Sequence, residues 1–135
     1  IMVKQIFVNL PVKNLEKSKE FFTKMGFSFN PQFTDEKGAC LVLNDSIFVM
    51  LLSEEFFKSF TKKDIPNTEK TVEAILAVQA ESFEDVETLA KKAFDAGAKE
   101  TYRFDYGWMK NIAFADLDGH YWEIFFADMS KMPNE

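Results

Sequence analysis

Hydrophobic residues follow two periods along this chain, one typical of strands and one of helices, and the same order occurs twice. Between Asn14 and Gly26, the residues Leu15, Phe22 and Met25 share one face of a helix. Asparagine is a favoured first residue of a helix, and glycine commonly follows the last one. Short apolar runs bounded by turn residues predict strands over residues 3–10, 27–29, 39–43 and 47–52. The first half is therefore predicted to be a β-α-β-β-β unit.

The second half repeats this order. Ser82 precedes two acidic residues, and Val86, Ala90 and Phe94 then follow at helical spacing until Gly97. Strands are predicted over residues 71–80, 101–104, 111–115 and 120–127. This internal repetition indicates two copies of one supersecondary unit.

We predict a single α+β domain over the whole chain. Its parts are a first unit (1–52), a linker (53–70) and a second unit (71–129). The linker contains Phe56, Phe57 and Phe60. It is either a short amphipathic helical turn followed by a solvated connection, or a lid whose phenylalanines cover a pocket. We favour the connection, because most segments between units only connect them.

Charge and cysteine content narrow the function classes. The chain carries 22 acidic and 16 basic residues, a net charge of −6, without a dense basic patch. Nucleic acid is therefore excluded as a partner, because its binding depends on neutralising phosphates. No apolar run is long enough to cross a bilayer, so we expect no membrane association. The lone Cys40 lies in an apolar run, which predicts a buried thiol and fits a cytoplasmic location.

Two motifs suggest a family. The segment from Leu10 to Phe27 resembles V-x-D-x-x-x-S-x-x-F-Y-x-x-x-G-F, with Asn14 in place of the usual aspartate. The segment from Asp116 to Glu123 resembles D-P-D-G-x-x-x-E, with leucine in place of the proline. Together they are similar to the vicinal oxygen chelate superfamily, which includes glyoxalase I, bleomycin-resistance proteins and extradiol dioxygenases. The resemblance implies two paired β-α-β-β-β units that form a curved mixed sheet around a cavity.

In the metalloenzymes of this superfamily, side chains from four strands hold one divalent metal. The resemblance places these four positions at Phe7, Met50, Ile75 and Glu123. A divalent metal needs about three or four protein donors, and one carboxylate does not supply them. We therefore favour no cofactor. The alternative is a divalent metal held by Glu123 and oxygen donors from a shifted register. Residues of the same strand parity that could supply them are Gln5, Asn9, Glu73 and Gln79.

Glu123 is the candidate catalytic or ligand-binding residue. Its strand is apolar on both faces, which predicts a buried carboxylate that needs a partner or a function. Asp116 and Asp118 lie in a turn containing glycine, where aspartate is common, so we expect them to be structural. Strand parity, the repeated turns and one loop position predict a ligand pocket lined by Phe7, Asn9, Met50, Ile75, Gln79, Trp108, Tyr121 and Glu123.

Two functions from different classes remain open at this point. The first is a small-molecule binding protein with an aromatic-lined cavity and a degenerate metal site. The second is a metal-dependent enzyme that uses Glu123, either a glyoxalase-type lyase or isomerase or a dioxygenase-type oxidoreductase. The missing histidines favour the first, since His120 is the only one in the chain. The 16 phenylalanines suggest surplus apolar surface, and we expect a homodimer.

Overall fold

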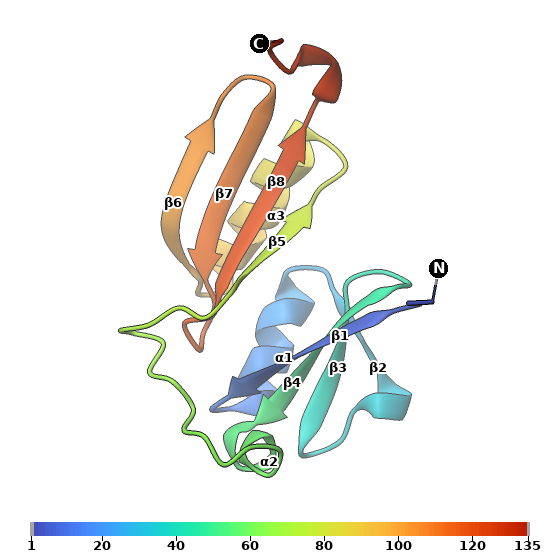
Figure 1. Cartoon of the computed structure of the whole chain (residues 1–135), viewed down its shortest axis with the longest axis vertical. Coiled ribbons are helices and arrows are strands. Elements are labelled where there is room, and N and C mark those ends of the chain that lie inside the picture. The colour runs from blue at the N-terminus through green and yellow to red at the C-terminus, as the bar shows by residue number, and fades with distance from the viewer. Residues whose placement is uncertain (1, 135) are drawn as a thin grey trace. The chain divides into compact units, whose positions relative to one another are not determined.

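The computed structural model describes residues 2–134 and divides into two compact units (Figure 1). The first comprises Ile1–Asn67 and the second Thr68–Glu135. Each unit contains one four-stranded mixed sheet, and the two sheets have equivalent strand orders, β1-β4-β3-β2 and β5-β8-β7-β6. In each sheet the first strand runs parallel to the last strand of its own unit, whereas the other neighbours are antiparallel. The predicted α+β fold with two β-α-β-β-β units is therefore confirmed.

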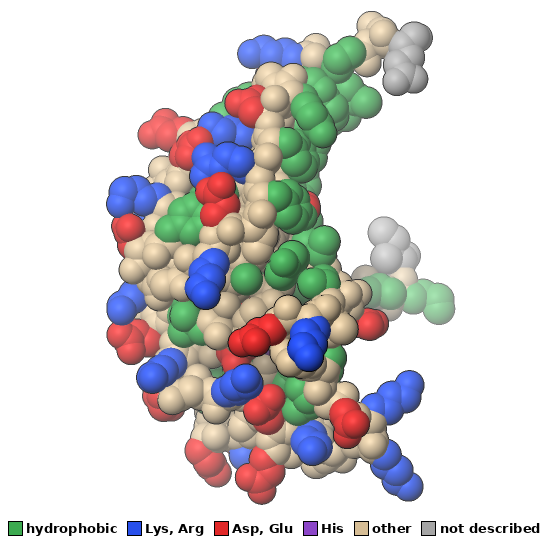
Figure 2. Space-filling view, turned by 90° about the vertical axis from the view of Figure 1, so that its left-hand side faces the viewer, with side chains coloured by type: hydrophobic (Ala, Val, Ile, Leu, Met, Phe, Trp, Pro, Cys, Tyr) green, Lys and Arg blue, Asp and Glu red, His purple; other side chains and the backbone are tan. Residues whose placement is uncertain are grey.

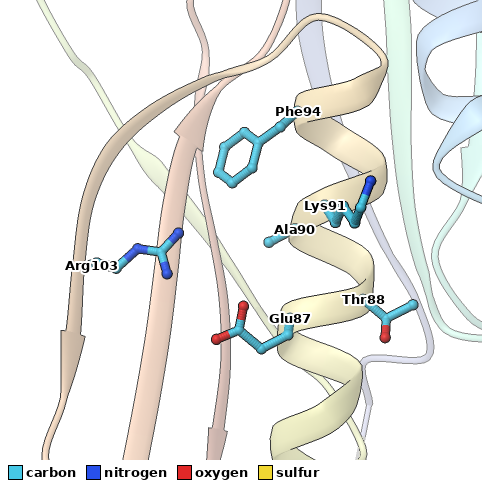
Figure 3. Close-up of a pocket in the computed structure, with 6 residues that line it drawn as sticks. All are labelled: Glu87, Thr88, Ala90, Lys91, Phe94 and Arg103. Carbon is cyan, nitrogen blue, oxygen red and sulfur yellow. The ribbon is translucent and has the colours of Figure 1, made fainter.

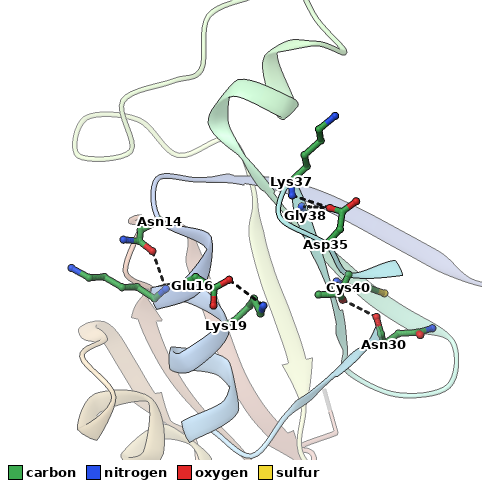
Figure 4. Close-up of polar contacts among 10 residues, drawn as sticks. Asn14, Glu16, Lys19, Asn30, Asp35, Lys37, Gly38 and Cys40 are labelled. Atoms are coloured by element: carbon green, nitrogen blue, oxygen red, sulfur yellow. Dashed lines mark hydrogen bonds and ion pairs between the residues drawn. The ribbon is translucent and has the colours of Figure 1, made fainter. Parts of the chain in front are cut away.

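The first unit contains a four-stranded sheet, the helix α1 and the shorter helix α2. Its elements are β1 (Ile6–Val12), α1 (Leu15–Lys24), β2 (Ser28–Asn30), the 3-10 helix η1 (Pro31–Phe33), β3 (Gly38–Val42), β4 (Ile47–Ser53) and α2 (Glu54–Lys58). The side chain of Asn14 accepts a hydrogen bond from the Lys17 backbone N–H, as expected of an N-cap (Figure 4). Figure 4 also shows Asp35 accepting hydrogen bonds from the backbone of Lys37 and Gly38, which shapes the turn before β3.

The core of the first unit lies between α1 and one face of its sheet. Phe21, Phe22 and Met25 of the helix segment are almost fully buried, as are Leu41 and Leu51 of the sheet. Burying side chains of this size stabilises a fold by about 1.5–3 kcal/mol each. Because strand side chains alternate, the residues next to Leu41 and Leu51 in sequence lie on the opposite face of the sheet.

The second unit has the same plan. Its elements are β5 (Ile75–Gln79), α3 (Phe83–Asp95), β6 (Lys99–Asp105), β7 (Met109–Ala115), β8 (Tyr121–Ala127) and the 3-10 helix η2 (Met129–Lys131). Ser82 caps α3 by accepting a hydrogen bond from the Asp85 backbone N–H. Gly97 follows the helix with a φ of 115°, in the left-handed region where glycine is favoured.

Helix α3 covers one face of the second sheet. Val86, Ala90 and Ala93 of the helix are buried, as are Ile112 of β7 and Ile124 of β8. Side chains of the opposite parity face away from α3, and we call them the helix-free face of the second sheet. By register it comprises Ile75, Ala77, Gln79, Lys99, Tyr102, Phe104, Met109, Asn111, Ala113, Ala115, Tyr121, Glu123, Phe125 and Ala127.

Some strand ends differ from those that the sequence predicts. The first strand begins at Ile6 and the fifth at Ile75, later than expected, because pairing starts where their partners Ile47 and Tyr121 begin. The prediction that the first strand ends at residue 10 is wrong, because the strand runs through Pro11 to Val12. Proline is tolerated here because β1 is an edge strand of its sheet.

Strand β6 contains a β-bulge that the sequence does not predict. Lys99 lies opposite Ala115 and Tyr102 lies opposite Ala113, so β6 has one residue more than β7 over this stretch. The extra residue is Thr101, whose hydroxyl oxygen is buried without a hydrogen-bond partner among the described residues. The bulge reverses the alternation from this point on, and Tyr102 therefore lies on the helix-free face.

The helices within residues 2–134 are all too short or too polar to span a membrane.

Candidate functional site

Three of the predicted pocket residues lie together in the first unit. Asn9 and Met50 are register partners on β1 and β4, and Phe7 lies two positions before Asn9 on the same face. This face points away from α1, since the neighbouring Leu51 is buried in the core. Phe7 stacks on Phe48 with 4.6 Å between ring centroids. The structure therefore brings these three residues to one aromatic sheet face.

Four more predicted residues share the helix-free face of the second sheet. Ile75 pairs with Tyr121, and Gln79 with Phe125, while Glu123 lies between these two rows on β8. In Figure 2, the upper part is the second unit, with hydrophobic side chains along its right-hand edge and charged ones on its left. Trp108 lies apart from these strands, in the loop between β6 and β7, where its carbonyl accepts a hydrogen bond from the Asp128 backbone.

A tyrosine–carboxylate pair occupies the centre of the helix-free face. Tyr102 of β6 donates its hydroxyl hydrogen bond to Oε2 of Glu123 on β8, across Ala113 of the intervening strand. Desolvation by burial, followed by the hydrogen bond and the charge of Glu123, raises the pKa of Tyr102 to about 12. The phenol therefore remains protonated at neutral pH and acts as the donor of the pair.

An unpartnered amide lies in the next row of the same face. Asn111 of β7 is flanked in register by Phe104 of β6 and Phe125 of β8, and its side chain has no exposed surface. Neither its amide nitrogen nor its amide oxygen finds a hydrogen-bond partner among residues 2–134. Each such group costs about 1–3 kcal/mol of folding free energy, so the amide destabilises the apo protein.

The donors around Glu123 do not fit a divalent metal. Its register neighbours on both sides are Ala77 and Ala113, which carry no ligand atom, and Tyr102 already uses one carboxylate oxygen. Within residues 2–134, no three His, Cys, Asp or Glu side chains gather closely enough to hold an ion. A metal in this superfamily would need about two further strong donors at this position.

None of the residues proposed as shifted-register donors is a register neighbour of Glu123. The side-chain amide of Gln5 donates to the Asp45 carbonyl, and that of Asn9 donates to the Phe7 carbonyl. Gln79 lies on the same face as Glu123, but its register partner is Phe125. Glu73 precedes β5 and has no strand position.

Asp116 has the structural role that its turn predicts. One of its oxygens accepts hydrogen bonds from the backbone of Asp118 and His120, and the other accepts one from the indole N–H of Trp122. Burial raises the pKa of Asp116, while His120 and these hydrogen bonds act in the opposite direction. Cys40 is likewise fully buried, as expected, and burial raises the pKa of its thiol.

A groove on the other side of the second sheet carries no free charge. It lies between α3 and β6, where Arg103 and Phe94 point toward one another (Figure 3). Arg103 pairs with Glu100, and Glu87 pairs with Lys110. Lys91 pairs with Asp95 of its own helix. Exposed ion pairs of this kind contribute little to stability.

Comparison with known proteins agrees with this architecture. A family model described as bleomycin resistance protein-like N-terminal matches residues 4–44. A hypothetical protein from S. aureus superposes with a TM-score of 0.78 at 25% identity, covering 94% of this chain and 96% of that one. The chain has the fold of the vicinal oxygen chelate superfamily. No curated protein matches the sequence significantly.

Other solved structures show how widely this fold is used. A glyoxalase/bleomycin resistance protein/dioxygenase family enzyme from Burkholderia phytofirmans has a TM-score of 0.73 at 14% identity, over 90% of this chain and 96% of that one. A fosfomycin resistance protein from Listeria monocytogenes has a TM-score of 0.66 at 16% identity, with coverages of 96% and 98%. At these identities the vicinal oxygen chelate fold is shared, and function must be argued from the site itself.

Sequence reasoning missed two residues of the site, Tyr102 and Asn111. Asn111 had a usable signal, because it is the one polar residue in the predicted strand over residues 111–115 and shares parity with Ala113. Tyr102 had no such signal. Simple alternation from Lys99 places Tyr102 on the side of α3, and only the bulge moves it to the side of Glu123.

We predict that Tyr102 stabilises the protein in a pH-dependent manner. Its folded-state pKa of about 12 lies above the ordinary value of 10. The folded state therefore holds this proton more tightly, and stability falls as pH rises from about 10 to 12. Tyrosinate absorbance should show one late-titrating tyrosine that disappears in Tyr102→Phe, whereas an unchanged titration curve in that variant would contradict the assignment.

We also predict that Glu123 does not hold a transition metal. Calorimetric titration of the apo protein with zinc, nickel and manganese should show no stoichiometric site of micromolar or tighter affinity. Glu123→Gln serves as the control. Tight binding in the natural chain that this substitution abolishes would restore the metalloenzyme hypothesis.

Proposed function

We propose that the protein binds a small organic molecule on the helix-free face of the second sheet, without a metal. The observation that carries this proposal is the juxtaposition of the Tyr102–Glu123 pair with the unpartnered Asn111 amide. These polar groups stand among aromatic side chains, the combination that small-molecule sites use for orientation and affinity. In this proposal the degenerate metal position is a polar contact for the ligand.

The surroundings of the polar groups support a ligand of modest size. Ile75, Ala77 and Gln79 of the edge strand β5 are exposed, so this side of the face is accessible. Tyr121 and Phe125 flank Glu123 along β8 and are only partly buried. An exposed aliphatic and aromatic surface with a few hydrogen-bonding groups is typical of recognition sites.

The first unit contributes to this proposal by analogy of position only. Phe7, Asn9 and Met50 occupy the corresponding face of their own sheet, opposite α1. Their inclusion in the same pocket as Glu123 stays a prediction from the sequence, as does that of Trp108. Substitutions at these positions that leave ligand binding unchanged would restrict the site to the second sheet.

We predict that Asn111→Leu has opposite effects on stability and on binding. It removes two unpartnered polar atoms from a buried site, so the free energy of unfolding in urea should rise by about 1 kcal/mol. Binding of 2-phenylethanol and related aromatic probes should weaken by about tenfold. In this proposal the ligand displaces the packing that buries Asn111 and meets the amide, which leucine does not offer.

The probes are best followed by 15N–1H NMR titration. Compounds that bind should shift backbone signals of Ala77, Ala113 and Glu123 on the helix-free face, and not those of Ala90 on α3. Asn111→Ser provides a polar control that should not gain stability as leucine does. Unchanged probe affinity in Asn111→Leu would make the amide purely structural, and shifts confined to α3 would place the site elsewhere.

We further propose that the protein is a homodimer. Large hydrophobic side chains remain exposed in the structure, among them Ile6, Phe33, Ile47 and Phe60. Association buries such surface from water. Light scattering at micromolar concentration should give about twice the chain mass of 15.6 kDa, and a mass near 15.6 kDa would contradict the proposal.

A further inference from the structure

One oxygen of the Glu123 carboxylate is left without a partner. The hydroxyl of Tyr102 donates to Oε2, and Oε1 takes part in no hydrogen bond or ion pair with residues 2–134. The side chain is partly buried rather than freely solvated. A carboxylate oxygen without a protein partner is a strong acceptor for a charged donor.

The β5 side of Glu123 carries one short side chain and two exposed ones. Ala77 is the register partner of Glu123 on that strand, and its methyl group is too short to reach the carboxylate. Ala77 is exposed, as are Ile75 and Gln79 on either side of it along β5. On β8, Tyr121 and Phe125 lie two positions from Glu123 in each direction and point to the same face.

The helix-free face carries one negative and one positive side chain, and they lie apart. Glu123 is the only acidic residue among the register positions of the helix-free face, and Lys99 is the only basic one. Lys99 lies on the far edge strand opposite Ala115, is exposed, and makes no ion pair with Glu123. The charge of Glu123 is strong enough at Tyr102 to help raise its pKa.

We propose that the bound molecule presents a single ammonium group to Oε1 of Glu123, between the rings of Tyr121 and Phe125. This inference rests on the proposed function and names its ligand class, an amine with an apolar body. A cation forms a charge-assisted hydrogen bond with the free oxygen, and the two aromatic rings attract it further through their π faces.

Tyr102 makes the site selective among cations. A guanidinium or amidinium group binds a carboxylate best through two parallel hydrogen bonds, one to each oxygen. The Tyr102 hydroxyl already uses Oε2, so only one such bond is available. An ammonium group needs only one oxygen and loses nothing by this arrangement.

The test compares four aromatic probes by NMR titration of the full chain. They are 2-phenylethylammonium, benzamidinium, neutral 2-phenylethanol and anionic phenylacetate. In the natural chain, 2-phenylethylammonium should bind about tenfold more tightly than 2-phenylethanol. Glu123→Gln should remove this preference while keeping an acceptor for Tyr102. Tyr102→Phe frees the second oxygen and should improve benzamidinium binding relative to the ammonium by several-fold.

The control is Glu87→Gln, which makes the same change of charge on the α3 side of the unit and should leave all four affinities unchanged. An ammonium preference that persists in Glu123→Gln, or equal binding of 2-phenylethanol and phenylacetate, would overturn this inference and leave the proposed function intact. Failure of all four probes to shift the helix-free face would instead remove the proposed function, together with the inference. Thermal unfolding of each variant checks that it remains folded.

Discussion

The Tyr102–Glu123 hydrogen bond depends on one extra residue in an edge strand. Between Lys99 and Tyr102, strand β6 advances three residues while its partner β7 advances only two. This bulge leaves the Thr101 hydroxyl buried without a partner, and in exchange it turns the tyrosine toward the helix-free face. Without the bulge the phenol would lie on the side of α3, and Glu123 would have no donor. The rest of the candidate site follows from this placement.

Asn111 on the helix-free face lowers the stability of the fold, and no hydrogen bond among residues 2–134 compensates for this loss. Asn111 sits among apolar neighbours with neither amide atom satisfied, where an apolar side chain of similar size would be more stable. On the packed side of the sheet, Ile112 and Ile124 pack against α3 as ordinary core residues. Local destabilisation beside a carboxylate is typical of a site that selection keeps for binding.

The sequence predicts most of the fold because its signals are local. Asn14 and Ser82 cap helices by short-range hydrogen bonds. The glycines after α1 and α3 adopt conformations that few other residues tolerate. The face of Glu123 is equally predictable from strand alternation. The ends of β1 and β5 are not, because they depend on where a partner strand begins. Tyr102 is missed for a similar reason, since a bulge is a property of two strands together.

An NMR experiment on the folded chain shows whether the Tyr102 ring lies on the side of Glu123 or on the side of α3. If the bulge holds in solution, nuclear Overhauser effects should connect the ring protons of Tyr102 with the methyl group of Ala113. They should be absent between that ring and the methyl group of Ala90 on α3. Contacts from the Tyr102 ring to Ala90 and not to Ala113 would show the strand in the unbulged register and would contradict the account.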